Sequence, residues 1–494
     1  MKTRIKQLFL LPALVAGLCL MPAGRVTAQA FTNLYSFTAE GYDSAIETET
    51  NRDGAYPAAG LIVSGNTLYG TASGGGTNGL GTVFAVNTDG TGFTVLHTFT
   101  ALLNSTNSDG ANPAAGLLQD GGFLFGTAQN GGMNGNGTVF RISTVSLSFT
   151  NLHSFTALSA PYYQGGTNGD GANPAAGLAL VGVNTLYGTA EHGGTNGGGT
   201  VFVLNINGAG FTILHTFTNN PDGADPAGEL ISSGNTLYGT AGGGGNGGDG
   251  TVFALNTDGT GFTNLYSFTA FSSVYFNNSD GANPDGGLVL SGNTLYGTTH
   301  SAGTNGGGTV FAVTTNGTRF TNLHPFTGNS DGDNPYAGLI ISGGTLFGTA
   351  GNGGAGYGTL FAVATNGTGF TTNGVGAATL HTFTNTPDDG FSPHASLLLS
   401  GNTLYGTAEG GGTNGSGMIF SLALPTPPLT ITLSGTNDVV TWPTNVLVFT
   451  LQSTTNLAPP VVWTIISPPY AVVNGQNTVT NPLSGTQTFY RLSL

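Results

Sequence analysis

A tandem repeat makes up most of this 494-residue chain. The pattern Leu-aromatic-Gly-Thr returns seven times, at intervals of 51 to 62 residues. A repeat of this length is typical of folds built from one supersecondary unit, in which each unit buries its apolar side against the next. The seven copies, called units 1 to 7, begin this pattern at Leu68, Leu124, Leu186, Leu237, Leu295, Leu346 and Leu404.

Each unit contains four short segments rich in β-branched and aromatic residues. In unit 1 they read AGLIVS, TLYGTA, GTVFAV and FTVLHTFT. Gly65-Asn66 and Asp89-Gly90 lie between segments one and two and between segments three and four, and both dipeptides supply the positive φ angles that tight hairpins need. The sequence therefore predicts four antiparallel strands per unit and an all-β fold.

The two ends of the repeat region complement one another. An isolated fourth strand, FTNLYSFT at residues 31–38, precedes unit 1, and unit 7 stops after its third strand at residues 417–424. Pairing between these segments would complete the last sheet and leave no exposed edge. We expect a seven-bladed β-propeller over residues 31–424, closed by its N-terminal strand.

A glycine-rich loop joins the second and third strands of every unit, as in GGGTNGLG of unit 1. A phosphate-binding loop must open a helix so that backbone N–H groups point at the anion, whereas these loops open a strand. Nucleotide binding is therefore not expected, and the glycines are interpreted as turn residues.

Residues 1–30 have the features of a secretory signal peptide. Three basic residues among the first six precede an apolar run, and Ala28-Gln29-Ala30 offers a small-residue cleavage site. The single cysteine, Cys19, lies in this run and follows Leu18, which does not fit a lipoprotein acylation site. We expect cleavage after Ala30 and a mature chain, without thiols, that is secreted or displayed on the cell surface.

The charge of residues 31–494 limits the classes of molecule that the chain is expected to bind. They hold four arginines, no lysine and 23 acidic residues, a formal charge of 4 − 23 = −19. Such a chain repels phosphate backbones and anionic lipids, so nucleic acid is not an expected partner. No apolar stretch in residues 31–494 is long enough to span a bilayer.

The sequence changes character after a Pro-rich linker, PTPP at residues 425–428. Residues 429–494 lack the glycine-rich repeat and hold both tryptophans, Trp442 and Trp463. A small β-sandwich is predicted by six or so short segments with alternating apolar positions, which read LTITLSG, DVVTWP, VFTLQST, VVWTIIS, NTVTNP and TFYRLSL. It resembles the immunoglobulin-like or fibronectin-like modules of exported proteins. Its expected role is sorting, attachment or binding.

The repeated pattern DGANPAAGL…SGNTLYGTASGGGTNGLGTVFAVNTDGTGF resembles the GloVer tandem repeat. This repeat occurs in exported bacterial proteins that end in one of several anchoring or sorting modules, and the resemblance covers roughly residues 31–424. It implies a secreted, propeller-like protein. The resemblance implies no enzymatic reaction that could be transferred to this chain, so it assigns no catalytic residues.

Each unit is introduced by Asp-Gly-x-x-Pro. The favoured interpretation is a turn in which the carboxylate accepts backbone N–H groups and the proline fixes entry into the strand. The alternative is calcium, the one cofactor that we consider, because first strands at the centre would bring the carboxylates around the mouth of a channel, and calcium takes about six to eight oxygens. The aspartates are Asp53, Asp109, Asp170, Asp222, Asp280, Asp331 and Asp389.

Five histidines share one position of the fourth strand, which Tyr35 and Tyr266 occupy in the other copies. The position alternates with phenylalanine on the same strand face. A position that accepts either histidine or tyrosine among phenylalanines predicts packing between units and not metal ligation. The histidines are His97, His153, His215, His324 and His381.

Two sets of residues break the repeat in loops that we expect on one face. His192, His300, His394, Glu191 and Glu409 depart from the consensus in units 3, 5 and 7, so we do not expect them to share one site. Long loops of variable length suit binding, and the alternative is packing of these loops on themselves. They carry aromatic residues able to stack on sugar rings, Tyr162, Tyr163, Tyr275 and Phe276.

These observations favour an exported, non-catalytic binding or structural protein whose loops contact polysaccharide or protein. One alternative is an extracellular glycan hydrolase or lyase that uses the five consensus-breaking residues. Acid–base hydrolysis needs two carboxylates with different roles, whereas the seven aspartates are equivalent, so no catalytic residue is assigned. Another alternative is a self-assembling surface protein.

Overall fold

The computed structural model describes residues 30–45, 47–272, 277–367, 379–425, 427–443, 449–458, 461–466, 470–473, 475–482 and 488–493. The predicted signal peptide, except Ala30, lies outside these residues. The described chain is all-β, and its one helical element is the short 3-10 turn η1 (Tyr162–Gln164). No helix in these residues is long and apolar enough to cross a membrane.

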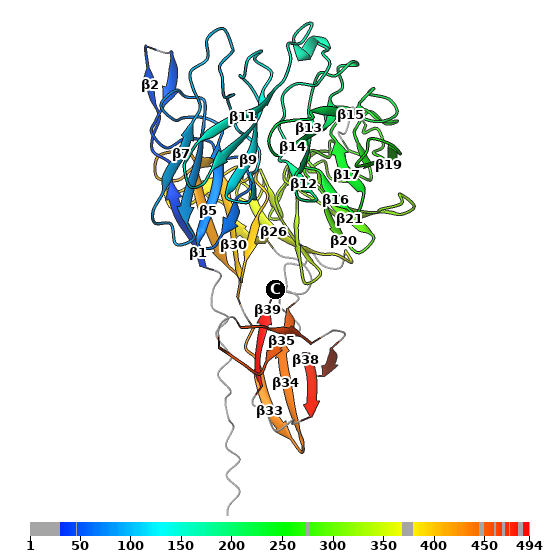
Figure 1. The fold of residues 1–494 in the computed structure, drawn as a ribbon. Coiled ribbons are helices and arrows are strands. Elements are labelled where there is room, and N and C mark those ends of the chain that lie inside the picture. Colours follow the sequence, from blue (N-terminus) through cyan, green and yellow to red (C-terminus); the bar gives the residue numbers. More distant parts are fainter. Residues whose placement is uncertain are drawn as a thin grey trace, which may run out of the picture.

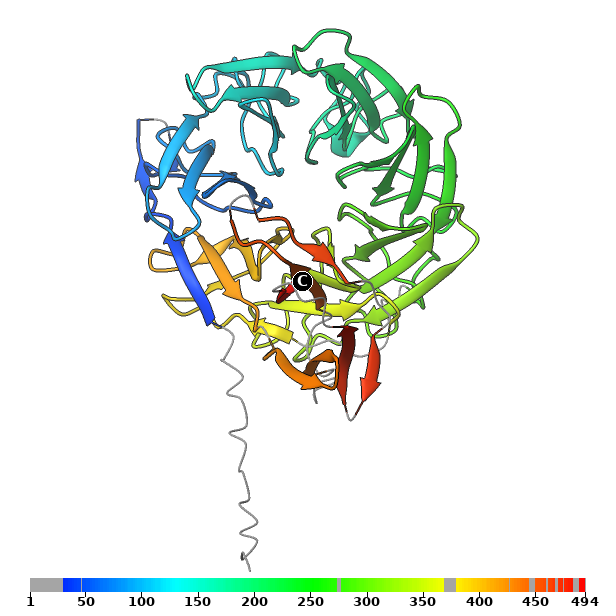
Figure 2. The ribbon, with the colours of Figure 1, turned by 60° about the horizontal axis from the view of Figure 1, so that its bottom comes forward.

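Four-stranded antiparallel sheets follow one another through the described repeat region and form a ring of propeller-like blades (Figures 1 and 2). The sheet of unit 1 runs in the order β4 (Ile62–Ser64), β5 (Thr67–Ala72), β6 (Thr82–Asn87) and β7 (Thr94–Thr98). The four predicted strands of the unit are therefore confirmed.

Units 2 to 6 repeat this order. Unit 2 holds β8 (Leu118–Asp120), β9 (Phe123–Ala128), β10 (Thr138–Ser143) and β11 (Phe149–Ser154), and unit 3 holds β12 (Ala179–Val181), β13 (Thr185–Ala190), β14 (Thr200–Asn205) and β15 (Thr212–Thr216). Unit 4 holds β16 (Ile231–Ser233), β17 (Thr236–Ala241), β18 (Thr251–Asn256) and β19 (Thr263–Ser267). Unit 5 holds β20 (Val289–Ser291), β21 (Thr294–Thr299), β22 (Thr309–Thr314) and β23 (Phe320–Pro325), and unit 6 holds β24 (Ile340–Ser342), β25 (Thr345–Ala350), β26 (Thr359–Ala364) and β27 (Thr379–Thr382).

The sheet of unit 7 takes its outer strand from the other end of the repeat region. Its order is β1 (Ala30–Ser36), β32 (Met418–Ala423), β30 (Thr403–Ala408) and β29 (Leu398–Ser400). β1 pairs antiparallel with β32, with Phe31 opposite Leu422. The predicted pairing of the N-terminal strand with unit 7 is confirmed.

A buried threonine in the second strand of every unit links that unit to the next. Each threonine Oγ1 donates a hydrogen bond of 2.8 to 3.5 Å to a main-chain oxygen just ahead of the next unit's first strand. These bonds run from Thr71 to Ala115, Thr127 to Ala176, Thr189 to Gly228, Thr240 to Gly286, Thr298 to Ala337, Thr349 to Ala395 and Thr407 to Ala59. The last bond joins unit 7 to unit 1.

The hydrophobic core lies between successive sheets. Val83 and Phe99 of unit 1 pack with Leu124 and Phe140 of unit 2, and equivalent clusters lie between the other neighbours, including units 7 and 1. The glycine of Leu-aromatic-Gly-Thr serves this packing. A Cβ on Gly70 would lie 2.6 Å from Cζ of Phe84, so the position must stay free for the ring.

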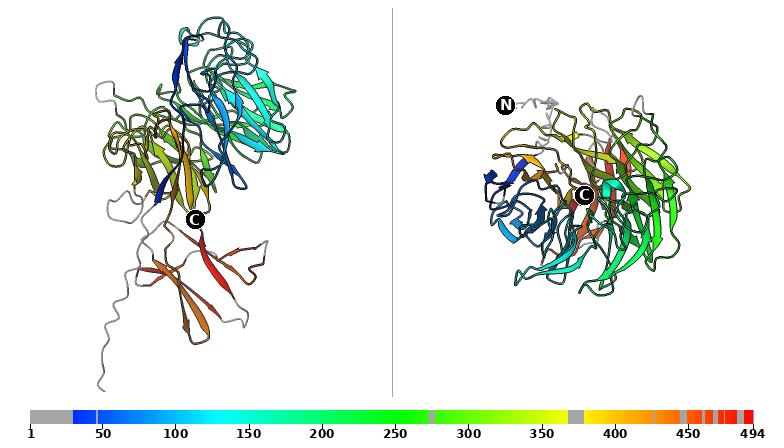
Figure 3. Two further views of the ribbon diagram at one scale, coloured as in Figure 1. Left: turned by 90° about the vertical axis from the view of Figure 1, so that its left-hand side faces the viewer. Right: turned by 90° about the horizontal axis from the view of Figure 1, so that it is seen from above.

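The C-terminal residues form two further antiparallel sheets outside the ring (Figure 3). One has the order β33 (Thr430–Ser434), β34 (Asn437–Pro443), β38 (Gln476–Pro482) and β37 (Ala471–Val473); the other has β36 (Thr464–Ile465), β35 (Thr450–Thr454) and β39 (Phe489–Ser493). Buried Val440, Trp442 and Leu451 form one cluster between them. The six predicted segments all contain strands, while β37, only three residues long, was not predicted.

Candidate functional site

Two loops of every unit meet on one face of the ring, called the loop face. The Asp-Gly-x-x-Pro loop ahead of the first strand is bridged to the glycine-rich loop after the second strand, through pairs such as Ala55 with Gly74 and Ala172 with His192. In unit 7 the pairing extends to β28 (Gly390–Phe391) and β31 (Gly410–Gly411). Gly75 has φ 64°, and a Cβ there would lie 2.6 Å from Oδ1 of Asn51, so glycine is required for this close approach.

The seven aspartates of Asp-Gly-x-x-Pro are buried beneath this face. Asp109 accepts hydrogen bonds from the main-chain N–H and the hydroxyl of Thr100, and its Oδ2 lies 2.9 Å from Nε2 of His97. Burial raises the pKa of Asp109, but the hydrogen bonds from His97 and Thr100 outweigh burial and hold the pKa below its ordinary value.

The same clamp recurs at the other units. Each aspartate contacts the fourth-strand histidine or tyrosine of the preceding unit at 2.6 to 3.1 Å, in the pairs Tyr35–Asp53, His97–Asp109, His153–Asp170, His215–Asp222, Tyr266–Asp280, His324–Asp331 and His381–Asp389. These carboxylates face the outer strand of the neighbouring unit, which differs from the alternative arrangement around a channel mouth. The described part of the chain contains no group of three or more His, Cys, Asp or Glu side chains that could hold a metal ion.

The fourth-strand histidines and tyrosines also pack between units. Six of these seven rings stack on a phenylalanine in, or directly before, the next unit's fourth strand, with centroids 3.6 to 4.1 Å apart. The stacked pairs are Tyr35–Phe93, His97–Phe149, His153–Phe211, His215–Phe262, Tyr266–Phe320 and His381–Phe31. This arrangement agrees with the packing role that the sequence predicts.

Side chains that break the repeat meet on the loop face of units 5 to 7. Tyr336 stacks on His300 with ring centroids 4.5 Å apart and meets His394 edge-on at 4.9 Å. A carboxylate lies at each end: Oδ2 of Asp285 is 2.6 Å from Nδ1 of His300, and Oε2 of Glu409 is 2.8 Å from Nδ1 of His394. We call these five residues the polar–aromatic band. His300 and His394 therefore belong to one continuous group, although their separation in the sequence argued against a shared site.

Complementary substitutions build this band. The residue after the proline of Asp-Gly-x-x-Pro is alanine in units 1 to 4 but Asp285, Tyr336 and His394 in units 5 to 7. Glycine follows the second strand in units 4 and 6, and a Cβ on Gly242 or Gly351 would collide with Asp285 or His394, respectively. The larger side chains thus occupy space that small residues of the neighbouring unit leave open. Sequence reasoning missed Tyr336, which a comparison of this one position across the units would have found.

His192 forms a second group in the same face. It stacks on Tyr162 of η1 with centroids 4.4 Å apart, and its Nδ1 lies 3.3 Å from Oδ1 of Asp225. Burial lowers the pKa of His192, but the hydrogen bond to Asp225 and the charge of Glu191 outweigh burial and raise it. Burial also raises the pKa of Glu191. Tyr163 beside this group is 73% exposed, while Tyr275 and Phe276 lie outside the described residues.

The residue before the loop proline adopts a left-handed conformation in all seven units, with φ between 53° and 57°. Asparagine tolerates this region, and four asparagines use it to donate from Nδ2 to a main-chain oxygen of the preceding unit. These bonds join Asn112 to Ser73, Asn173 to Gln129, Asn283 to Gly242 and Asn334 to His300. Unit 1 instead places Tyr56 at this position, an aromatic residue that the left-handed region disfavours.

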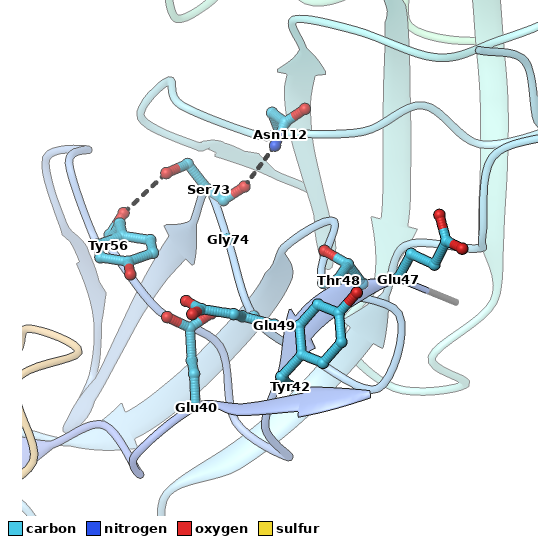
Figure 4. Close-up of a pocket in the computed structure, with 11 residues that line it drawn as sticks. Glu40, Tyr42, Glu47, Thr48, Glu49, Tyr56, Ser73, Gly74 and Asn112 are labelled. Carbon is cyan, nitrogen blue, oxygen red and sulfur yellow. Dashed lines mark hydrogen bonds between the residues drawn. The ribbon is translucent and has the colours of Figure 1, made fainter. Parts of the chain in front are cut away.

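Tyr56 lines a cavity of about 500 Å³ over unit 1 (Figure 4). A hairpin of β2 (Gly41–Asp43) and β3 (Thr48–Thr50), within the long connection from β1 to β4, forms one wall. Glu40, Tyr42 and Glu49 point toward the same space in Figure 4. A hydrogen bond to Glu40, together with burial and nearby carboxylates, raises the pKa of Tyr56 to about 12.

One carboxylate stands at the inner rim of the ring. Glu229 lies just ahead of β16, where the equivalent residue is glycine in five units and Ser396 in unit 7. These positions follow one another around the rim, because a Cβ on Gly177 would lie 3.1 Å from Oε2 of Glu229 and one on Gly60 would lie 3.2 Å from the main-chain oxygen of Ser396. The Glu229 side chain is exposed to solvent. Many protein atoms nevertheless surround its carboxyl and remove part of its hydration, and this desolvation raises its pKa to about 7.

The solved structures that match this chain are distant from it in sequence. The extracellular domain of a hybrid two-component system from B. thetaiotaomicron shares 10% identity at a TM-score of 0.47, over 82% of this chain and 44% of that one. An oligogalacturonate lyase from Vibrio parahaemolyticus shares 12% identity at a TM-score of 0.44, over 81% and 97%. A nidogen/laminin complex shares 14% identity at a TM-score of 0.36, over 58% and 87%.

No curated protein matches the chain. The Gloeobacter/Verrucomicrobia repeat matches three consecutive stretches, residues 24–169, 162–273 and 270–448. Together these stretches include every repeat unit and the start of the C-terminal sheets. The chain belongs to the Gloeobacter/Verrucomicrobia repeat family, in agreement with the resemblance of its repeated pattern.

Proposed function

We propose that this chain is an exported binding protein built on a closed, seven-bladed β-propeller with a C-terminal β-sandwich. Closure is supported by the pairing of β1 with β32 and by the threonine bonds that pass from each unit to the next. The sandwich is supported by the core that the two C-terminal sheets share. Export is supported by the basic and apolar sequence of residues 1–30.

The loop face is the proposed binding surface, and polysaccharide is its proposed ligand. The observation that carries this proposal is the polar–aromatic band, in which the ring of Tyr336 contacts those of His300 and His394 and a carboxylate lies at each end. Aromatic rings pack against the apolar faces of sugars, and carboxylates accept hydrogen bonds from sugar hydroxyls. Tyr336 is 37% exposed and so is accessible to such a ligand.

The polysaccharide is a neutral one under this proposal. The formal charge of −19 in residues 31–494 disfavours uronate-bearing or sulfated chains. The band itself adds Asp285 and Glu409 and contains no arginine. A neutral glycan therefore gains the hydrogen bonds without electrostatic repulsion.

Substitution toward the repeat's own consensus tests this proposal. Tyr336→Ala installs the residue that units 1 to 4 already carry, so the fold should be retained. Binding of residues 31–494 to a panel of neutral and acidic polysaccharides should show selective binding that Tyr336→Ala weakens about tenfold. Ala227→Gly, at the equivalent position of unit 4, is the control. Unchanged binding in Tyr336→Ala would contradict the role of the band, and the same panel with added calcium tests for metal dependence.

A glycan hydrolase or lyase is the second candidate function. Glu191 favours it, because burial raises the pKa of this carboxyl and a hydrolase needs a carboxyl that can donate a proton. Asp225 is a second carboxyl close to it. Reducing-end release from a bound polysaccharide, abolished by Glu191→Gln, would support catalysis. Binding without turnover supports the non-catalytic proposal, and concentration-dependent assembly in sedimentation would favour a structural role instead.

A further inference from the structure

The cavity over unit 1 shares none of its lining residues with the polar–aromatic band, although the charge of Glu409 at one end of that band reaches Tyr56. It is built by features that only this unit has among the described residues. The β2–β3 hairpin forms one wall, and the ring of Tyr56 forms another. Gly74 makes room for this ring, because a Cβ there would lie 2.7 Å from Cδ2 of Tyr56. The cavity is therefore a specific departure from the repeat.

The side of the cavity below Tyr56 is held in place by hydrogen bonds. The main-chain oxygen of Tyr56 accepts from the N–H of Ser73 at 3.2 Å and from its hydroxyl at 3.0 Å. Asn112 of unit 2 donates from Nδ2 to the main-chain oxygen of Ser73 at 2.9 Å (Figure 4). These bonds fix the orientation of the cavity wall before any ligand binds.

The lining of the cavity is acidic and aromatic. Three carboxylates, of Glu40, Glu47 and Glu49, line it together with the rings of Tyr42 and Tyr56, and its lining contains no lysine, arginine or histidine. The ion pairs in the described part of the chain all involve histidines, and none engages these glutamates. The exposed Arg52 in the same connection is not part of the lining.

We propose that this cavity binds the ammonium group of an amino sugar, in a chain of de-N-acetylated units. Carboxylates neutralise an ammonium ion, and the faces of tyrosine rings attract it by cation–π interaction. A volume of about 500 Å³ accommodates a sugar-sized ligand. Tyr42 is 67% exposed and Tyr56 is 37% exposed, so both rings can also pack against a sugar ring.

An organic cation fits better than a metal ion. The glutamates of the cavity do not form a group of three or more ligands that could hold a metal within the described residues. The proposed ligand also differs from the neutral polysaccharide of the band, because its recognition depends on a positive charge. The two sites can therefore be tested independently.

Isothermal titration of residues 31–494 with a glucosamine tetramer and with an N-acetylglucosamine tetramer tests the proposal. The two ligands share a sugar backbone but differ in charge. We expect the glucosamine tetramer to bind at least tenfold more tightly. Equal affinity for both tetramers, or tighter binding of a lysine tetrapeptide, would overturn the assignment to an amino sugar, as would displacement of the tetramer by an equimolar amount of calcium.

Two variants connect binding to the cavity. Tyr56→Asn installs the residue that four other units carry at this position, and Glu49→Gln removes one charge from an exposed side chain, so both should fold. Each should weaken glucosamine binding at least tenfold. Asp89→Asn removes the same charge from an exposed turn outside the cavity and should leave affinity unchanged. An equal loss in Asp89→Asn would show non-specific charge attraction and contradict the proposal.

Tyr336→Ala separates this inference from the proposed function. It should leave glucosamine binding unchanged while it weakens binding of the neutral polysaccharide. Glucosamine binding without any neutral polysaccharide binding would contradict the proposed function alone. Loss of glucosamine binding in Tyr336→Ala would overturn the cavity as the ammonium site.

Discussion

Thr407 donates a hydrogen bond from its buried hydroxyl to the main-chain oxygen of Ala59, 348 positions earlier in the chain, at 3.1 Å. The same bond joins Thr240 to Gly286 at 3.0 Å within the body of the repeat. One bond joins unit 7 to unit 1 and the other joins two sequential units, and their donor and acceptor groups are the same. Because the two bonds are equivalent, the effects of removing each can be compared to test whether unit 7 is joined to unit 1.

Thr407→Val and Thr240→Val should destabilise the protein equally. Each removes a buried hydroxyl and leaves a main-chain oxygen without its partner, at a cost of about 1–2 kcal/mol. Chemical denaturation of both variants checks this. A cost for Thr240→Val alone would indicate that the ring is open at units 7 and 1.

Asp109→Asn should lower the free energy of unfolding at pH 7 by about 1–3 kcal/mol, because it weakens the clamp on His97 and Thr100. The folded-state pKa of Asp109 lies below its ordinary value of 3.8. Its contribution is therefore present above the unfolded pKa and is lost as the pH falls through the folded pKa. Stability measured from pH 7 down to pH 2 should fall less steeply in Asp109→Asn than in the wild type, and parallel curves would refute this role.

Glu229 should give the opposite pH dependence. Its folded-state pKa of about 7 lies above the ordinary value of 4.5, so its contribution to stability is fully present below pH 4.5 and is lost as the pH rises through 7. Glu229→Gln should be more stable than the wild type at pH 8 and equal to it at pH 4. Because the side chain is open to the solvent, the gain should be on the order of 1 kcal/mol or less. A gain that does not vary with pH would exclude titration of Glu229 as its cause.

Much of the fold is predictable because the sequence contains seven copies of one unit, and each copy shows the same pattern of strands and turns. Hairpin dipeptides such as Asp89-Gly90 mark the turns, and the unmatched strands at residues 31–38 and 417–424 indicate how the last sheet is completed. The short β37 (Ala471–Val473) escaped prediction because three residues give no clear alternation.

The candidate site was harder to predict because it depends on contacts between units. His300 and His394 are far apart in the sequence, and the residue that joins them, Tyr336, sits in an ordinary short loop. The contacts of carboxylates such as Asp109 could not be predicted either, because their partners belong to the preceding unit. Comparing each position across the seven units reveals Tyr336 and Glu229 as departures, but not what they contact.

The central claim is that departures from the repeat on the loop face create the binding site. The most direct measurement compares polysaccharide affinity of the wild type with that of Asp285→Ala/Tyr336→Ala/His394→Ala, which gives units 5 to 7 the alanine of units 1 to 4. Both proteins should show the same cooperative thermal unfolding, and only the wild type should bind neutral polysaccharide. Equal affinity of the two folded proteins would contradict this account.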